Sequence, residues 1–147
     1  MRRFGEVRRA GIKYTRRPGA YGVILRDGQA LLALNESAGE EFALPGGGID
    51  PGESPVQALH REAIEETGYR IAVTRRIGAY QRFTYMPEYD LWAHKVCHIY
   101  LCRAGRSIAP PMEPDHQPLW VPVGDAVDLI SLAGDRMMFR KAIGLIR

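Results

Sequence analysis

Residues 44–69 read LPGGGIDPGESPVQALHREAIEETGY, and this stretch carries the strongest structural signals of the chain. Ser54 and Gln57 have the spacing of a capping box, and a proline between them occupies the first helical position. Gly68 supplies the left-handed backbone at which helices commonly end. The stretch therefore predicts a helix over residues 55–67, preceded by a glycine-rich segment.

Three acidic side chains share one face of this predicted helix. Glu62, Glu65 and Glu66 stand at i, i+3 and i+4, so their carboxylates converge and repel each other. A divalent cation would relieve this repulsion, and hard oxygen ligands favour magnesium or manganese. Arg61, four residues before Glu65, can orient or partly neutralise an acid. Helix spacing alone leaves a solvated acidic face as an equal alternative.

Three consecutive glycines, Gly46, Gly47 and Gly48, precede the helix. Because they have no side chains, their backbone carbonyls and amides can come close to a bound ion or phosphate. Glycine runs also occur in inert turns, so a plain exit from a strand is the alternative interpretation.

The chain resembles the Nudix box, GX5EX7REUXEEXGU with U a bulky aliphatic residue. The match is Gly47-x5-Glu53-x7-Arg61-Glu62-Ala63-x-Glu65-Glu66-x-Gly68-Tyr69. The fixed glycines, glutamates and arginine are all present, whereas Ala63 and Tyr69 depart from the U positions. The order of the flanking predicted elements is also similar to that family.

This resemblance implies an α/β fold, an α/β/α sandwich around a mixed β-sheet, in a single Nudix hydrolase domain over residues 18–147. It also implies hydrolysis of the diphosphate linkage in a nucleoside diphosphate derivative, with Mg²⁺ or Mn²⁺ as cofactor. We expect a MutT-like enzyme acting on a (d)NTP. The alternatives are an ADP-ribose, sugar-nucleotide or dinucleoside-polyphosphate hydrolase, an RNA 5′-pyrophosphohydrolase, and a non-catalytic nucleotide-binding module.

By position in the box, the resemblance also implies roles for individual residues. Glu62, Glu65 and Glu66 would be metal ligands within the catalytic set. The remaining residues with implied roles are the backbone carbonyl of Gly46 as a further ligand, Gly47 beside it, and Glu53 and Arg61, which would orient the glutamates.

The general base is not assigned by the box. Many members of the family have an acid a few residues before the position of Trp120, and this chain has Gln117 there. Candidates outside the box are Glu88, Asp90, Glu113, Asp115 and His116.

Other side chains are candidates for substrate contact, although most of the aromatic residues must be core. A nucleobase can stack on an aromatic ring, and a distal phosphate can bind an arginine. His94 and His98 share one strand face without an evident third zinc ligand, so we expect structural or surface roles for them. The remaining candidates are Tyr21, Phe42, Tyr80, Phe83, Tyr85, Trp92 and Trp120 for stacking, and Arg16, Arg17, Arg26 and Arg82 for phosphate.

Composition limits the class of protein. The chain has 147 residues, 46% hydrophobic and 25% charged, which is ordinary for one globular domain and excludes a disordered or fibrous protein. No apolar run is long enough to span a bilayer, and residues 1–9 do not look like a secretory signal, so we expect a cytoplasmic protein. Cys97 and Cys102 are five apart in one predicted strand and should face opposite sides as free thiols.

Basic charge is concentrated in residues 1–17, an N-terminal arm with seven basic side chains and one acid. The rest of the chain is net acidic, so the arm accounts for the overall charge of +3. RNA or a polyphosphate is one interpretation of its role, and a solvated tail with an edge strand is the other. A homodimer is also left open.

The expected elements around the box form a mixed sheet flanked by helices. An Asp-Gly turn should join two short strands in a hairpin. The expected ranges are strands over 21–25, 30–34, 69–85, 95–103 (ending near Gly105) and 119–122, loops over 35–41, 86–90 and 110–118, and helices over 125–132 and 135–146.

Overall fold

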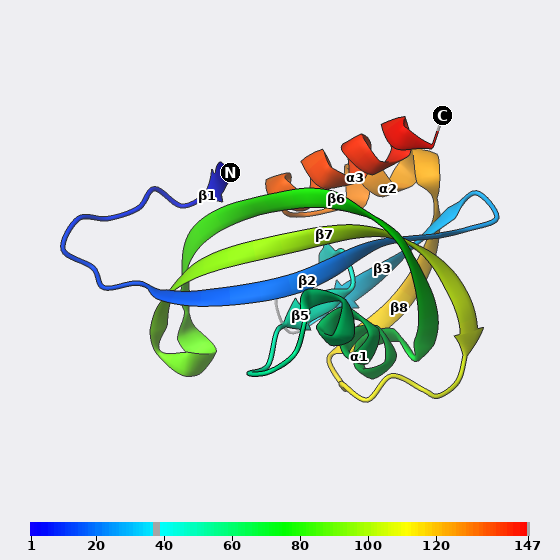
Figure 1. Cartoon of the computed structure of the whole chain (residues 1–147), viewed down its shortest axis with the longest axis horizontal. Coiled ribbons are helices and arrows are strands. Elements are labelled where there is room, and N and C mark those ends of the chain that lie inside the picture. Colours follow the sequence, from blue (N-terminus) through cyan, green and yellow to red (C-terminus); the bar gives the residue numbers. More distant parts are fainter. Residues whose placement is uncertain (37–38, 147) are drawn as a thin grey trace.

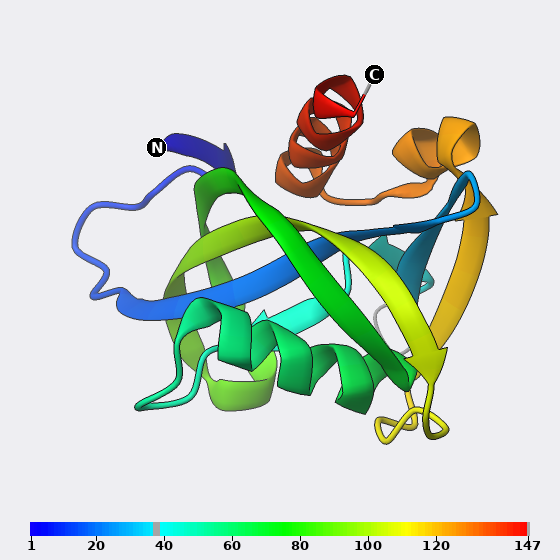
Figure 2. The same ribbon diagram turned by 45° about the vertical axis from the view of Figure 1, so that its right-hand side comes forward.

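The structure, a computed structural model, describes residues 1–36 and 39–146, and a curled mixed β-sheet forms its centre. Figures 1 and 2 show α1 on one face of the sheet and α2 and α3 on the other. The strands are β1 (Arg2–Gly5), β2 (Thr15–Arg26), β3 (Gln29–Asn35), β4 (Glu41–Ala43), β5 (Gly46–Gly48), β6 (Tyr69–Met86), β7 (Leu91–Ser107) and β8 (His116–Pro122). The helices are α1 (Pro55–Thr67), a 3₁₀ turn at Pro87–Tyr89, α2 (Val123–Leu129) and α3 (Ala133–Leu145).

The sheet is built around three long strands. Its order is β1-β6-β7-β2-β3-β4, with β5 paired to β2 and β8 paired to β3. Strands β2 and β7 run parallel, whereas β6 and β7 form an antiparallel hairpin. The predicted hairpin is confirmed, because β2 and β3 pair antiparallel around Asp27 and Gly28.

Two hydrophobic cores lie on opposite faces of this sheet. One core contains Cys97 and packs against α2 and α3, and the other contains Cys102 and packs against α1. The two cysteines therefore lie on opposite faces of the sheet, as their odd spacing predicts. Both are buried and free. The α/β sandwich expected from the sequence is therefore confirmed.

Helix α1 begins and ends as predicted. The Ser54 side chain accepts from the backbone of Gln57, the Gln57 side chain accepts from the backbone of Ser54, and Gly68 is left-handed with φ of 79°. The prediction that a helix extends to Leu132 is wrong. The chain leaves α2 at Leu129 because Ser131 bonds to β4, donating to the Phe42 carbonyl at 2.9 Å and accepting from the Phe42 amide at 3.0 Å.

Several strand limits also differ from the prediction. Strand β7 does not stop near Gly105, because its partner β6 begins at Tyr69 and pairs with Ser107. Strand β8 begins at His116, inside the expected loop, because it pairs with β3 as far as Asn35. The short strands β4 and β5 were not predicted, and residues 37 and 38 of the expected polar loop lie outside the described residues.

The basic N-terminal residues contact the sheet at two places. Strand β1 pairs in parallel with the β6 edge, and residues 15–17 are the beginning of β2. No helix among the described residues is long and apolar enough to cross a membrane.

Helix α3 begins with Gly134 packed closely against the Tyr80 ring of the sheet. A Cβ on Gly134 would overlap the ring of Tyr80, whereas one on Gly144, in the same helix, would meet nothing. We expect Gly134→Ala to lower the free energy of unfolding by about 1–3 kcal/mol through overpacking. Gly144→Ala should raise it by about 0.5–1 kcal/mol, because alanine favours a helix more than glycine does. Urea unfolding followed by circular dichroism measures both, and a loss at Gly144 equal to that at Gly134 would contradict the packing account.

Candidate active site

Arg61 is the centre of an ion-pair network at the glycine-rich end of α1. Its guanidinium holds both oxygens of Glu53, with Nε–Oε2 at 2.8 Å and Nη2–Oε1 at 2.9 Å. It also donates to Glu62 at 3.0 Å, to Glu65 at 3.2 Å and to the carbonyl of Gly48 at 3.0 Å. One guanidinium therefore ties the acidic face of α1 to strand β5.

Glu53 is itself fixed on two sides. Besides Arg61, the backbone amide of Asp50 donates to Glu53 Oε1 at 2.8 Å. These bonds, chiefly the one from Arg61, lower the pKa of Glu53 to about 2. The same pairing raises the pKa of Arg61, so both groups stay charged across the neutral range.

The glycines of strand β5 let its backbone lie close to α1 and to β2. A Cβ on Gly47 would overlap the carboxylate of Glu62, and one on Gly46 would overlap the backbone of β2. Gly46 has φ of 146°, and its amide lies 3.4 Å from Glu66 Oε1. The glycines therefore leave room for the Glu62 and Glu66 carboxylates beside the β5 backbone.

Acidic groups from two segments meet here. Ligand atoms of Glu62, Glu65 and Glu113 lie within 4.8 Å of one another, and so do those of Glu66, Glu113 and His116. Glu113 belongs to the loop after β7, which is fixed to the end of α1. In this loop the Met112 amide donates to the Glu65 carbonyl at 2.7 Å.

His116 completes this cluster at the start of β8. Its Nδ1 lies 2.9 Å from Glu113 Oε2 without hydrogen-bond alignment and is buried with no other partner among the described residues. Its Nε2 lies 4.0 Å from Glu66 Oε2. A buried ring nitrogen is thus aimed at the acidic cluster.

Burial makes the ionised form of the two most buried carboxylates of the cluster unfavourable. Glu66 is only 6% exposed, and burial, followed by the nearby Glu113 charge, raises its pKa well above the usual value. Burial likewise raises the pKa of Glu62, although Arg61 opposes the rise. Burial therefore disfavours the ionised form of both carboxylates, and in the portion that the structure describes only Glu62 has an arginine partner that opposes this effect.

The residues present fit a divalent cation. The converging atoms are mostly carboxylate oxygens, the donors that magnesium and manganese prefer. The glycines give the backbone access to the cluster, and a bound cation would offset the burial and the Glu113 charge that raise the pKa of Glu66.

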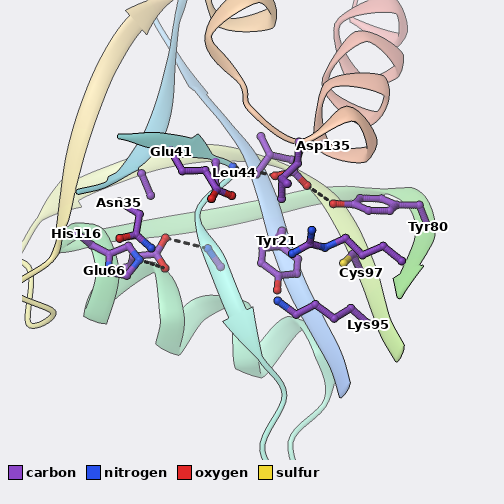
Figure 3. Close-up of a pocket in the computed structure, with 15 residues that line it drawn as sticks. Tyr21, Asn35, Glu41, Leu44, Glu66, Tyr80, Lys95, Cys97, His116 and Asp135 are labelled. Atoms are coloured by element: carbon purple, nitrogen blue, oxygen red, sulfur yellow. Dashed lines mark hydrogen bonds and ion pairs between the residues drawn. The ribbon is translucent and has the colours of Figure 1, made fainter. Parts of the chain in front are cut away.

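A cavity of about 170 Å³ opens beside this cluster (Figure 3). Glu66 and His116 lie on one side of it, and Asp135 and Tyr80 on the other. Asp135 is buried, accepts from the Tyr80 hydroxyl and lies 3.3 Å from the Leu44 amide. The cavity therefore runs from the acidic cluster to a buried carboxyl at the start of α3.

Two cationic side chains line the cavity. Arg82 of β6 and Lys95 of β7 are directly opposite in the sheet register. Neither has an ion pair with a carboxylate in the described parts of the chain. Burial, followed by the Arg82 charge, lowers the pKa of Lys95. Both side chains can therefore donate hydrogen bonds to a ligand in the cavity.

The structure brings some of the sequence candidates to the site and places others elsewhere. Among the base candidates, Glu113 and His116 join the acidic cluster, whereas Glu88 and Asp90 lie at the far β6–β7 turn. Asp115 contributes a backbone carbonyl to Glu36. Of the arginines and rings, the cavity is lined by Arg82, Tyr21 and Tyr80 but not by Arg16, Arg17, Arg26, Phe42, Phe83, Tyr85, Trp92 or Trp120.

The two candidate histidines do not form a metal site within the described residues. His94 stacks on Phe83 and contacts Gln81, and His98 contacts Arg76. Sequence reasoning missed Lys95 and Asp135 as cavity residues. The alternation of β7 would have indicated Lys95, because Lys95 shares a face with the buried Cys97.

Comparison with known proteins shows the family of this chain. The NUDIX domain family matches residues 15–141, so the chain belongs to that family. It resembles the NUDIX hydrolase from Nitrosomonas europaea in structure, with a TM-score of 0.73, 17% identity, and coverage of 90% of this chain and 92% of the other.

Two relatives are similar in sequence. A candidate 8-oxo-dGTP diphosphatase of Bacillus subtilis (strain 168) is 40% identical over 74 residues, half of each chain. The CMP-5'-(N-acetyl-N-hydroxy-3-aminopropyl)phosphonate hydrolase of Streptomyces rubellomurinus (strain ATCC 31215) is 30% identical over 142 residues, covering 90% of this chain. The chain spans only 50% and 65% of the lengths of these relatives.

The charge on Glu66 should destabilise the fold when no divalent cation is bound. Because its pKa is raised on folding, the folded state binds more protons than the unfolded state, and stability falls as pH rises through that pKa. Glu66→Gln keeps an oxygen for the Gly46 amide and removes the charge. In EDTA at pH 7.5 we expect its Tm to exceed that of the wild type by about 3 °C, and the difference should shrink near pH 4.

Thermal unfolding by circular dichroism at both pH values makes this measurement. Glu6→Gln, which neutralises an exposed glutamate, is the matched control and should give no gain. A lower Tm for Glu66→Gln at pH 7.5 would contradict the account of an uncompensated buried charge.

Proposed function

We propose that this chain is a Mg²⁺- or Mn²⁺-dependent pyrophosphohydrolase that cleaves a nucleoside triphosphate. The observation that carries the proposal is the convergence of Glu62, Glu65, Glu66 and Glu113 beside a cavity of about 170 Å³ that Glu66 lines. Family membership supports the same reaction class.

The residues divide the work by position. Glu62, Glu65 and Glu66, together with the Gly46 carbonyl, would hold the cation, and Arg61 would keep their carboxylates converged. Bound magnesium would supply charge neutralisation for the pyrophosphate. Glu53 acts through Arg61, since it touches the guanidinium and not the acidic cluster.

Hydrolysis needs a group that accepts a proton from water. Water adds to one phosphorus, the bridging P–O bond breaks, and the two phosphate-bearing products separate. We assign proton acceptance to Glu113, because it is the acid outside α1 that reaches the cluster among the described residues. His116 lies beside this carboxylate, with Nδ1 at 2.9 Å from Glu113 Oε2.

The cavity chemistry favours a base that carries both acceptors and donors. Arg82 and Lys95 can donate to base carbonyls, and Asp135 can accept from an amino group. Guanine and cytosine present both kinds of group. The names of the two relatives refer to an oxidised guanine nucleotide and a CMP derivative, which supports guanine or cytosine nucleotides as substrates here.

Hydrolysis of a nucleotide panel tests the proposal. The panel holds the NTPs and dNTPs, oxidised dGTP, ADP-ribose, a sugar nucleotide, diadenosine polyphosphates and 5′-triphosphorylated RNA, each with Mg²⁺ or EDTA. Mg²⁺-dependent cleavage of triphosphates, fastest for guanine or cytosine, supports it. Cleavage of another class of compound would overturn the proposed substrate. If the folded protein cleaves none of the compounds, the proposal of an enzyme is overturned and a nucleotide-binding module is favoured.

Removing one proposed ligand should abolish most of the turnover. Mutation of a residue that only supports a metal ligand lowers metal affinity or activity by about 10–100-fold. Because Glu65 is itself a proposed ligand, we expect Glu65→Gln to lower kcat by at least about a hundredfold. The variant should keep its fold, because it loses a repelling charge. Steady-state rates at saturating Mg²⁺ measure this, with Glu6→Gln as the matched control. Near-normal turnover by Glu65→Gln would contradict the assignment.

Removing a cavity cation should weaken substrate binding more than turnover. A hydrogen bond to a charged group is worth about 1.5–3 kcal/mol, so Lys95→Met should raise KM by about tenfold to a hundredfold. We expect kcat to change much less, because Lys95 does not belong to the acidic cluster. Lys141→Met, at an exposed lysine of α3 that does not line the cavity, is the control. A fall in kcat at unchanged KM would contradict the binding role.

A further inference from the structure

Arginines of the N-terminal segment cover aromatic rings at one end of the sheet. The Arg3 guanidinium lies 5.5 Å from the Phe83 ring, and that of Arg8 lies 5.6 Å from Tyr14 and 5.9 Å from Phe83. The Arg9 guanidinium lies 5.1 Å from the Trp92 ring. We call this set the arginine–aromatic surface: Arg3, Arg8, Arg9, Tyr14, Phe83 and Trp92.

This surface is held in place by contacts to the sheet. Tyr14 meets Phe83 edge-on at 4.9 Å and Trp92 at 6.1 Å. The Arg9 amide donates to the Tyr14 hydroxyl at 3.0 Å, and β1 places Gly5 beside Phe83. Arg3 therefore lies in a strand that pairs with β6, and Arg8 and Arg9 follow that strand in the same segment.

The arginine–aromatic surface carries three guanidiniums, whereas the segment that supplies them, residues 1–14, contains one acid, Glu6. Arg3, Arg8 and Arg9 have no ion pair in the described ranges, where the carboxylate pairs gather at Arg61 and His116. The pKa of His94, stacked on Phe83, is lowered first by burial and then by nearby arginines that include Arg8 and Arg3. The guanidiniums are therefore available for anions.

Strand β2 connects this surface to the candidate active site. Arg16 pairs with His94 beside the surface, and five residues later Tyr21 pairs with Gly46 in the site. At about 3.3 Å per strand residue the separation is roughly 16 Å. By the alternation of β2, Arg16 and the buried Ala20 share the face against which α1 packs.

We infer that the arginine–aromatic surface binds single-stranded nucleic acid. Guanidiniums make strong, geometrically matched hydrogen bonds to phosphates, and their planes and the exposed parts of Tyr14 and Trp92 offer stacking faces for unpaired bases. A duplex hides those base faces, and a lipid surface does not use them. The surface is separate from the cavity that takes the proposed nucleotide, so this inference goes beyond the proposed function.

Fluorescence anisotropy with a 5′-labelled 12-nucleotide RNA of mixed sequence tests the inference. Each lost phosphate contact lowers the salt-dependence slope by about 0.7. For Arg8→Gln/Arg9→Gln we expect a slope reduced by about 1.4, which is roughly 25-fold weaker binding at 0.1 M salt. Arg70→Gln/Arg75→Gln, at the other end of β6, removes the same charge from exposed positions and should weaken binding less than threefold.

Hydrolysis of a free nucleotide and binding of other ligands complete the test. Hydrolysis of a free nucleotide should be unchanged in both double variants, which separates this inference from the proposed function. Single-stranded DNA of the same sequence shows whether the sugar matters within the same class of ligand. The inference is overturned by no RNA binding at 0.05 M salt, by equal losses in the two double variants, or by equally tight binding of a duplex or of phosphatidylserine vesicles.

Discussion

Mutual repulsion among the carboxylates of α1 is the constraint on which the candidate site depends. Glu62, Glu65 and Glu66 converge because helical spacing leaves them no alternative. Arg61 opposes the spreading of this group by bonding Glu62 and Glu65 while Glu53 holds the far side of its guanidinium. Burial, followed by the nearby Glu113 charge, raises the pKa of Glu66, and the hydrogen bond from the Gly46 amide only partly opposes the rise. A divalent cation bound among these carboxylates would offset the repulsion that Arg61 does not neutralise.

The rest of the fold serves to bring distant segments to this helix. The curled sheet carries β5 against α1, and Gly47 leaves room there for the Glu62 carboxylate. The loop after β7 returns to the end of α1 and delivers Glu113. On the other face, α3 begins at the sheet and places Asp135 in the cavity. The acidic cluster and the cavity thus adjoin although their residues come from every part of the chain.

Local signals predicted the parts of this arrangement that are local. The capping box, Gly68 and the acidic face of α1 could be read from the sequence, since each depends on neighbours within four residues. The cavity could not, because Lys95 and Asp135 meet only through pairing of β6 with β7 and docking of α3. Glu113 was one of five equal candidates until the contact between Met112 and Glu65 fixed its loop. The limits of β7 and β8 were likewise set by partner strands and not by their own residues.

We expect the carboxylates held around Arg61 to bind a divalent cation. Titration with Mn²⁺, followed by the electron paramagnetic resonance signal of the free ion, tests this expectation without relying on any substrate. The account predicts saturable Mn²⁺ binding by the wild-type chain and its loss in Glu65→Gln/Glu66→Gln, with both proteins folded by circular dichroism. Equal binding by the two proteins, or none by the wild type, would contradict the account.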